Sequence, residues 1–460
     1  MKKKTVLIAD AAYADLHVWE VYSEELWVEY EQSYAEGLDI AEYEDVFKAV
    51  AKLPRGAHKE KFASVLSEIL NCCGMREGYP YQEPSDIESI KELRKSYIFE
   101  KNKISRDMLK EKIYGAWLGR ICGCLLGKTV EGIRTHELHP LLKESGNFPM
   151  HRYIISSDVT QERIRKTTFP LAERCYADTV NGMPSDDDTN YMVLAQEVIK
   201  RYGRDFTPSD VARAWLDLQP RSAYCTAERV AFCNFERGIT PPQSATYRNK
   251  YREYIGAQIR GDYFGYINPG NPELAAELAF RDASISHVKN GIYGEMFIAA
   301  MLACAAVTSN IKDILWGGLA EIPCTSRLYE EIKKIISDYE KGVTKEECLQ
   351  RIHDSYDEYN GYHWCHTIPN AMIVAAALLY GNGDFGKSIC MAVETGFDTD
   401  CNGATVGSIL GMRNGKGGID NVWTEPIGDR LETTLFGLEA VSIKERVELT
   451  LCQAEIPLEI

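Results

Sequence analysis

Two short clusters of aspartates are the residues of this sequence best suited to chemistry. Asp186, Asp187 and Asp188 are consecutive within Pro-Ser-Asp-Asp-Asp-Thr-Asn, and Asp398 and Asp400 alternate within Gly-Phe-Asp-Thr-Asp-Cys-Asn. Adjacent carboxylates repel each other, and the dipole of a helix N-terminus offsets only about 0.3–1 kcal/mol for each. Carboxylate oxygens are the ligands that Mg²⁺ and Mn²⁺ prefer. Either cluster alone is also typical of a helix cap, but together the five side chains predict a site for two divalent cations.

A row of glycines adjoins each acidic cluster. Glycines recur every four residues ahead of the first cluster, at Gly115, Gly119, Gly123 and Gly127, and after the second, at Gly403, Gly407 and Gly411. Each glycine inside a helix costs up to about 1 kcal/mol relative to alanine, so a row of them needs a reason. The four-residue step leaves one helix face without side chains. Such a face allows either close helix packing or the close approach of a ligand, and the sequence leaves both open.

Apolar residues of helical period predict that most of the chain is α-helical. A change of composition near residue 105 predicts two parts, an acidic helical extension over 1–105 and a helical body over 106–460. In the extension we expect helices over 12–34, 59–70 and 85–99. In the body we expect them over 107–128, 189–202, 208–219, 272–284, 291–308, 327–340, 344–358, 369–381, 384–395 and 402–412. The 369–381 helix is apolar all round and should be central and buried.

The order of these motifs resembles the ADP-ribosylglycohydrolases, enzymes that remove ADP-ribose from modified arginine, serine and other acceptors. The resemblance rests on the glycine-rich helix with its ending Leu-Gly-Lys-Thr-Val-Glu at 126–131, on the Asp-Asp-Thr cluster, and on residues 396–400 leading into 404–407. It covers about 107–423 and leaves residues 1–105 outside. It implies an all-α, compact and roughly orthogonal helical domain with two Mg²⁺ or Mn²⁺ ions in a cleft.

The resemblance also implies roles for individual residues. Water would attack the anomeric carbon of an ADP-ribosyl or related ribosyl group through an oxocarbenium-like transition state. Glu131 and Asp187 are the expected catalytic residues, and the expected metal ligands are Asp186, Asp187, Asp188, Asp398 and Asp400. Expected substrate-binding residues are Gly123, Gly127, Asp262, Tyr266, His287, Gly396 and Asn402. Candidates to stack on adenine include Tyr266 and Trp364.

The sequence departs from the family pattern at several positions. Asp186 and Cys401 stand where the family has hydroxyl ligands, Cys124 stands where many members have aspartate, and the usual Gly-Asn-Gly segment is not evident. Sulfur is a soft donor and matches Mg²⁺ poorly. Either Cys401 does not coordinate, or the site prefers a softer ion such as Mn²⁺.

These departures leave alternatives to a metal-dependent ADP-ribosyl hydrolase. One is a non-catalytic ADP-ribose-binding protein of the same fold, and another is a hydrolase of a small nucleoside-like glycoside. A metallohydrolase of phosphate esters ranks last, because no Lys or Arg accompanies either acidic cluster, although Lys128 is nearby.

The composition restricts the partners and the compartment. The 460 residues carry a net charge of −16, and twelve carboxylates with no Lys or Arg lie between residues 5 and 47. We expect this acidic stretch to face solvent or a basic protein partner. A pI near 5.2 argues against nucleic acid. The apolar run after the first lysines stops at Asp10, too short for a signal core or a membrane span, and the scattered cysteines suggest no disulfide framework, so we expect a cytoplasmic protein.

In the 12–34 segment, Trp19, Tyr22, Leu26, Tyr30 and Tyr34 share one helix face. This face favours packing on the domain behind it, with the acidic face in water, over a partner-binding role.

Overall fold

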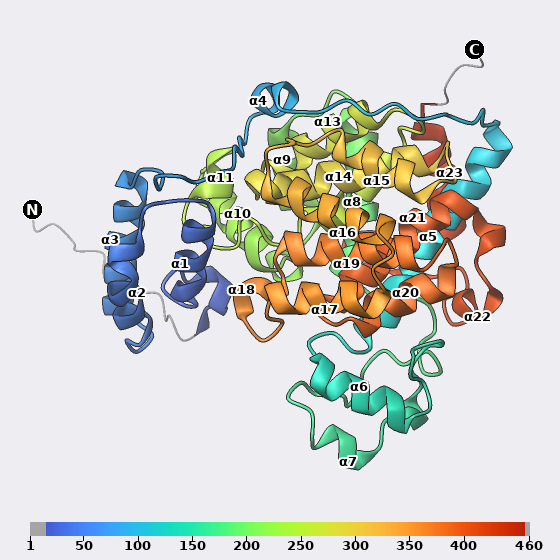
Figure 1. Cartoon of the computed structure of the whole chain (residues 1–460), viewed down its shortest axis with the longest axis horizontal. Coiled ribbons are helices and arrows are strands. Elements are labelled where there is room, and N and C mark those ends of the chain that lie inside the picture. Colours follow the sequence, from blue (N-terminus) through green and yellow to red (C-terminus); the bar gives the residue numbers. More distant parts are fainter. Residues whose placement is uncertain (1–14, 456–460) are drawn as a thin grey trace, which may run out of the picture.

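The computed structural model describes residues 15–455, and helices account for nearly all of its regular structure (Figure 1). The extension contains α1 (Leu26–Ala35), α2 (Glu44–Ala51), α3 (Ala57–Cys72) and α4 (Ile87–Glu92). The body contains α5 (Arg106–Lys128), α6 (Thr135–Glu144), α7 (Gln161–Ile164), α8 (Asp187–Tyr202), α9 (Pro208–Leu218), α10 (Thr226–Glu236), α11 (Gln243–Thr246), α12 (Asp262–Tyr266), α13 (Pro272–Ala283), α14 (Lys289–Ala305), α15 (Ile311–Leu319), α16 (Arg327–Glu340), α17 (Lys345–Ser355), α18 (Gly361–Trp364), α19 (Thr367–Tyr380), α20 (Phe385–Glu394), α21 (Thr399–Asn414), α22 (Asn421–Thr424) and α23 (Ile443–Gln453). A short antiparallel pair joins β1 (Leu431–Glu432) to β2 (Ala440–Val441). The all-α prediction is confirmed.

The two glycine rows pack against each other at the centre of the body. A Cβ added to Gly123 would lie 1.9 Å from the carbonyl oxygen of Gly403, and one added to Gly127 would lie 2.2 Å from that of Thr399. Because residue numbers rise along α5 as they fall along α21, the two helices are antiparallel. Their backbones fill the bare faces, so helix packing is the correct interpretation. The prediction that Gly123 and Gly127 present those faces to a substrate is corrected accordingly.

A single methyl group in this contact should be strongly destabilising. A Cβ on Gly407 would lie 2.0 Å from the Gly119 carbonyl oxygen, whereas one on Gly417 meets no described atom within 4 Å. We expect Gly407→Ala to lower the free energy of unfolding by about 3 kcal/mol, because neither backbone can move without separating the helices. Gly417→Ala is the matched control and should change it by less than about 1 kcal/mol. Urea denaturation measures both, and equal stabilities would contradict this account of the glycine rows.

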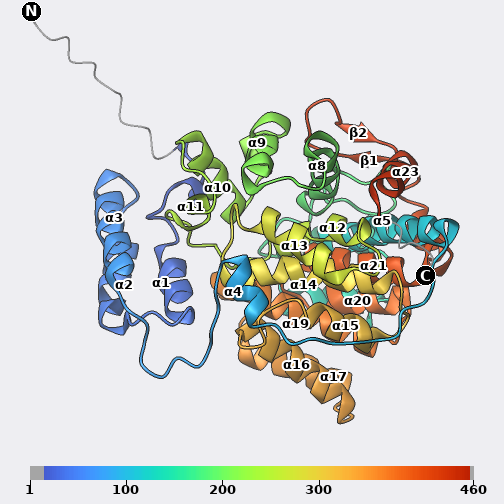
Figure 2. The same cartoon turned by 90° about the horizontal axis from the view of Figure 1, so that it is seen from above.

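Other buried helices surround the α5–α21 pair. In Figure 2, α14, α19 and α20 lie beside α21, and α8 and α23 lie on the α5 side. Every residue of α19 from Thr367 to Leu379 is buried, as predicted for a helix that is apolar all round. Helices α6 and α7 project from the body on one side (Figure 1). Among residues 15–455, no helix is both long and apolar enough to span a membrane.

Two of the helices expected in the extension are shorter in the structure. Residues 12–14 lie outside the described part, and α1 begins only at Leu26, because Glu25 adopts a left-handed conformation with φ 49°. Of the 85–99 segment only α4 is helical, with Asp86 rather than Ser85 as its N-cap. The chain then runs along the body toward α5 (Figure 1), and the Asn102 N–H donates to the Val307 carbonyl at 2.7 Å. The proposed boundary at residue 105 stays a prediction.

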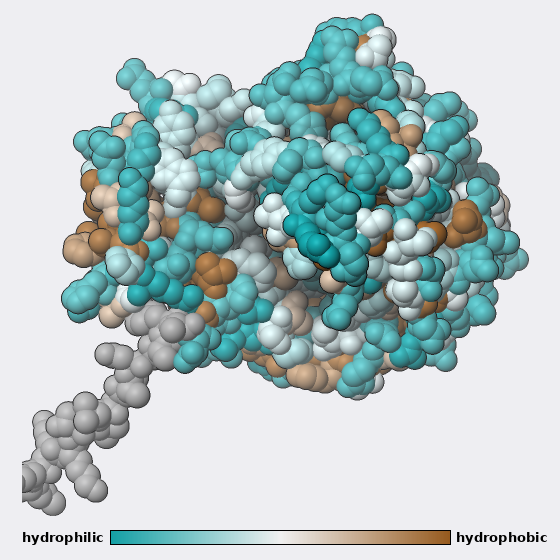
Figure 3. Space-filling model, turned by 90° about the horizontal axis from the view of Figure 1, so that it is seen from below, coloured by the Kyte–Doolittle hydropathy of each residue, from teal (hydrophilic) through white to brown (hydrophobic). Residues whose placement is uncertain are grey.

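The extension has a small core of its own. Tyr22, Leu26 and Tyr30 are buried against α2 and α3, so this part of the aromatic face serves packing, within the extension itself. The outer surface of the extension carries exposed apolar side chains, among them Phe62 (54% exposed) and Val65 (57% exposed). Figure 3 shows apolar residues gathered at this end of the molecule.

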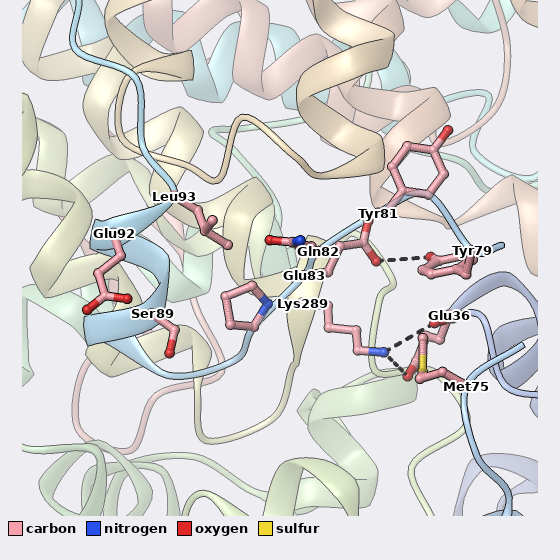
Figure 4. Close-up of a pocket in the computed structure, with 11 residues that line it drawn as sticks. Glu36, Met75, Tyr79, Tyr81, Gln82, Glu83, Ser89, Glu92, Leu93 and Lys289 are labelled. Carbon is pink, nitrogen blue, oxygen red and sulfur yellow. Dashed lines mark hydrogen bonds and ion pairs between the residues drawn. The ribbon is translucent and has the colours of Figure 1, made fainter. Parts of the chain in front are cut away.

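Several carboxylates of the acidic stretch pair with basic residues of the body. Arg252 contacts Glu29 at 2.7 Å and Glu36 at 2.6 Å, and Lys289 contacts Glu36 at 2.9 Å. Both glutamates are buried. Figure 4 shows Lys289 reaching Glu36 beside a pocket of about 460 Å³ between extension and body. The expectation that the acidic stretch faces solvent or a separate basic protein is therefore wrong for these residues, because their basic partners belong to the same chain.

Candidate functional site

Three distant segments of the chain bring the predicted carboxylates together. The first aspartate cluster lies at the N-terminus of α8, the second at the N-terminus of α21, and Glu131 follows the C-terminus of α5. The Thr399 hydroxyl donates to the Gly127 carbonyl at 3.0 Å and fixes the start of α21 against the end of α5. At the start of α8, Asp186 accepts the Asp188 N–H at 2.9 Å as the N-cap. The glycine rows thus bring Glu131 and the second aspartate cluster together, and α8 packs beside α5 with the first cluster.

Two groups of side chains within this cluster have the geometry of a cation site. Ligand atoms of Cys124, Asp186 and Asp188 lie within 4.8 Å of one another, and so do those of Asp188, Asp400 and Cys401. All of these residues are buried. Asp188 belongs to both groups and therefore links the two aspartate clusters.

Two basic side chains neutralise part of the cluster: Lys128, which the sequence places nearby, and Arg120, which was not anticipated. Lys128 lies 2.6 Å from an Asp186 carboxylate oxygen, and Arg120 lies 2.7 Å from one of Asp188. Arg120 also contacts Asp262 at 2.9 Å. The argument that no Lys or Arg accompanies the acidic clusters is therefore wrong, although both cations are already paired with carboxylates. An arginine within the apolar, glycine-rich sequence of α5 was the available signal, because a buried cation requires a partner.

Burial and mutual repulsion disfavour the ionised form of several carboxyl groups in the cluster. Burial, reinforced by Asp398 and Asp186, raises the pKa of Glu131 to about 7. Burial raises the pKa of Asp188 to about 8 even though Arg120 opposes the shift. Burial together with neighbouring carboxylates also raises the pKa values of Asp187 and Asp400 well above the ordinary range. A bound divalent cation would relieve this repulsion directly.

Two buried oxygens of the cluster also lack hydrogen bonds. Within residues 15–455, Asp188 Oδ2 and Asp400 Oδ1 have no hydrogen-bond partner. Buried carboxylate oxygens are nearly always satisfied, so such exceptions require an explanation. A hard or borderline divalent cation supplies one, because it takes carboxylate oxygens as ligands. The residues present therefore fit the cations that the sequence predicted.

Asn370 shapes the loop that carries the second aspartate cluster. Its side-chain oxygen accepts the Asp398 N–H at 3.1 Å and the Asn402 amide at 2.8 Å. The Trp364 indole N–H donates to the Phe397 carbonyl at 2.7 Å, one residue before Asp398. Asn402, predicted to bind substrate, thus takes part in holding the cluster. The positioning role of Asn370 was missed, although an asparagine within a wholly apolar helix was a usable signal.

Of the other predicted substrate-binding residues, Gly396 lies at this loop. It has φ +84°, and a Cβ there would lie 2.6 Å from a Glu358 carboxylate oxygen. The structure does not bring the remaining three to the surface of the site. Asp262 is buried and paired with Arg120, and the Tyr266 hydroxyl is hydrogen-bonded to Ser408 at 2.6 Å in the core.

The third of these residues, His287, is buried with its imidazole 3.9 Å from Glu228. Glu228 contacts Arg260 at 2.7 Å in a separate buried ion-pair network. Burial and the nearby Arg260 hold the pKa of His287 well below its ordinary value, so the imidazole is neutral and lies, like Asp262 and Tyr266, in the buried scaffold behind the cluster.

The comparison with protein families agrees with the sequence motifs. The profile of the ADP-ribosylglycohydrolase family matches residues 105–448. An uncharacterized protein from Archaeoglobus fulgidus is 23% identical over 349 residues, covering 73% of this chain and 99% of that protein. A solved structure described as an ADP-ribosylglycohydrolase-related protein complex shares 17% identity with a TM-score of 0.47, covering 76% of this chain and 99% of its own. Because the family match spans most of the sequence, the chain belongs to the ADP-ribosylglycohydrolase family.

Proposed function

We propose that this protein is a metal-dependent hydrolase of an ADP-ribosyl, or related ribosyl, N- or O-glycosidic bond. The observation that carries the proposal is the convergence of six carboxylates from three distant segments, with buried oxygens of Asp188 and Asp400 left without hydrogen bonds among the described residues. Family membership supports a glycohydrolase. The cations would be two Mg²⁺ or Mn²⁺, held by Asp186, Asp187, Asp188, Asp398 and Asp400.

The residues of the site would have different roles in the reaction. Bound divalent cations would orient the ribose hydroxyls and lower the pKa of a water molecule. Glu131 would accept the proton of the attacking water, since a carboxyl with a pKa of about 7 exchanges protons readily at neutral pH. Asp187, at the first position of α8 and half-buried, would assist the leaving group or the water. Lys128 and Arg120 would keep Asp186 and Asp188 in place.

An aromatic side chain beside the cluster supports recognition of a nucleotide. Trp364 is half-buried, and the Arg134 guanidinium lies 4.0 Å above its ring. Its indole N–H contacts the backbone immediately before Asp398. A planar ring with one cation on its face is suited to stack on adenine. An extended diphosphate can span the distance between this adenine and the ribose at the carboxylate cluster.

Turnover of a substrate panel tests the proposal. ADP-ribosylated arginine and serine peptides and nucleoside-like glycosides would be incubated with Mg²⁺ or Mn²⁺, and ribosyl release measured by chromatography. We expect Asp187→Asn, Asp400→Asn and Glu131→Gln to lose more than about 100-fold in kcat/KM, because even residues that only support metal ligands cost about 10–100-fold. Asp45→Asn, at an exposed position of α2, should keep full activity.

Two outcomes would contradict the proposal. Full activity of both Asp187→Asn and Asp400→Asn would show that the carboxylate cluster is not the active site. Calorimetric binding of ADP-ribose without ribosyl release from any substrate would favour the non-catalytic binding protein.

A further inference from the structure

Thiol groups stand among the carboxylates of the cluster. Cys124 joins Asp186 and Asp188 in one of the two ligand groups, and Cys401 joins Asp188 and Asp400 in the other. Cys401 lies in the first turn of α21 and is 5% exposed, so its sulfur is shielded from solvent. Each group therefore offers one sulfur and two carboxylates as donors.

The two ligand groups differ in which of their carboxylate oxygens already accept hydrogen bonds. In the group with Cys124, one oxygen of Asp186 accepts from Lys128 at 2.6 Å and the other accepts the Asp188 N–H at 2.9 Å. In the group with Cys401, Asp188 Oδ2 and Asp400 Oδ1 are the two buried oxygens that find no hydrogen bond within residues 15–455. Both free oxygens belong to the group that contains Cys401, whereas the group that contains Cys124 has only the shared Asp188 Oδ2.

We infer that Cys401 is itself a metal ligand and that, with Asp188 and Asp400, it selects a borderline divalent cation such as Zn²⁺, Co²⁺, Fe²⁺ or Mn²⁺ over Mg²⁺. Coordination converts the thiol to a thiolate: the S–H bond breaks, its proton leaves to solvent, and a sulfur lone pair forms the metal–sulfur bond. A thiolate in the donor set favours softer cations, whereas Mg²⁺ takes oxygen ligands almost exclusively. The inference deepens the proposed metal site and does not depend on which glycoside is cleaved.

Cobalt spectroscopy of the full chain tests this inference without reference to turnover. The metal-free protein would be titrated with Co²⁺, and a thiolate-to-cobalt charge-transfer band in the near ultraviolet is the expected result. Cys401→Ser should abolish the band and weaken Co²⁺ binding by more than about 10-fold, while changing Mg²⁺ binding by less than about threefold. Calorimetry would give both affinities.

Matched variants make the outcome decisive. Cys122→Ser is the control, because Cys122 is buried on α5 close to Cys124, yet its sulfur contacts the Trp423 carbonyl at 3.2 Å and not the cluster. It should retain the band. Cys401→Thr is a second variant that restores the hydroxyl type and should also lose the band, with helicity followed by circular dichroism.

The inference would be overturned if the wild-type protein shows no charge-transfer band. It would also be overturned if the band survives in folded Cys401→Ser or Cys401→Thr. A protein that shows the cobalt–thiolate band but releases no ribosyl product would support the inference while contradicting the proposed function, so the two failures are distinguishable.

Discussion

Raising the pH of the metal-free protein from about 5 to about 8 should lower its free energy of unfolding, by about 1.4 kcal/mol per pH unit for each carboxyl that is protonated only when folded. In the fold, the pKa of Glu131 is about 7 and that of Asp188 about 8, against ordinary values of 4.5 and 3.8. Across this window the unfolded carboxyls are ionised while the folded ones keep their protons. The folded state thus binds more protons, and that advantage is lost as the pH rises through the folded pKa values.

Urea denaturation with a chelator, repeated with saturating Mn²⁺, measures the effect. The cation binds the ionised carboxylates of the folded state, so its stabilisation should increase with pH. Glu228, whose pKa burial raises to about 7 beside Arg260, adds to the pH dependence with or without metal. The difference between the two titrations therefore reports the cluster alone. A Mn²⁺ stabilisation that is independent of pH would contradict the assignment of these carboxylates as ligands.

Asp400→Asn sharpens the same test. Burial and four neighbouring carboxylates raise the pKa of Asp400 well above its ordinary value, so the neutral amide removes a group that is costly to ionise. Without metal at about pH 8 the variant should be more stable than the wild-type protein, and Mn²⁺ should stabilise it less. Asp45→Asn, at an exposed position, should follow the wild type in both conditions. Gain of stability with loss of activity is the signature of a functional site.

The sequence was sufficient to predict the helices that periodicity and local end signals specify. The helix expected over 107–128 is α5, and that expected over 208–219 is α9, which ends one residue earlier at Leu218. Helix α2 in the extension and helices α6, α10 and α23 in the body were missed. In the extension, Glu25 at the start of α1 accepts a hydrogen bond from the Tyr251 hydroxyl, and the non-helical segment after α4 contacts distant backbone, such as that of Val307 through Asn102.

The carboxylates of the site were predictable, but their surroundings were not. Consecutive aspartates beside glycine-rich helices can be recognised as candidate metal ligands from residue type and spacing alone. Arg120 and Lys128 gain their roles only when α5 packs beside α8, and Asn370 only when α19 packs beside α21. Asp262 and His287 show the opposite error, because both were assigned to substrate and instead are buried within the scaffold, Asp262 as the partner of Arg120.

Replacing Arg252 should release the extension from the body. Arg252 is buried and contacts Glu29 and Glu36 of the extension at 2.7 and 2.6 Å. In Arg252→Ala both carboxylates lose this partner while still excluded from water, and removing one member of a buried ion pair typically costs about 3–5 kcal/mol. Lys48→Ala is the matched control. Lys48 pairs with Glu44 on the exposed face of the extension, where an ion pair contributes about 0–1 kcal/mol.

The effect should also reach the carboxylate cluster, because the extension supports the loop beside it. Glu31 of α1 accepts from the Asn360 amide at 2.7 Å, and Asn360 caps α18, whose Trp364 contacts the Phe397 carbonyl ahead of Asp398. We therefore expect Arg252→Ala to weaken Mn²⁺ binding as well as the fold, whereas Lys48→Ala should change neither. Thermal unfolding and Mn²⁺ calorimetry measure the two effects. If Arg252→Ala unfolds within about 1 kcal/mol of the wild type, the buried ion pairs do not fasten the extension to the body.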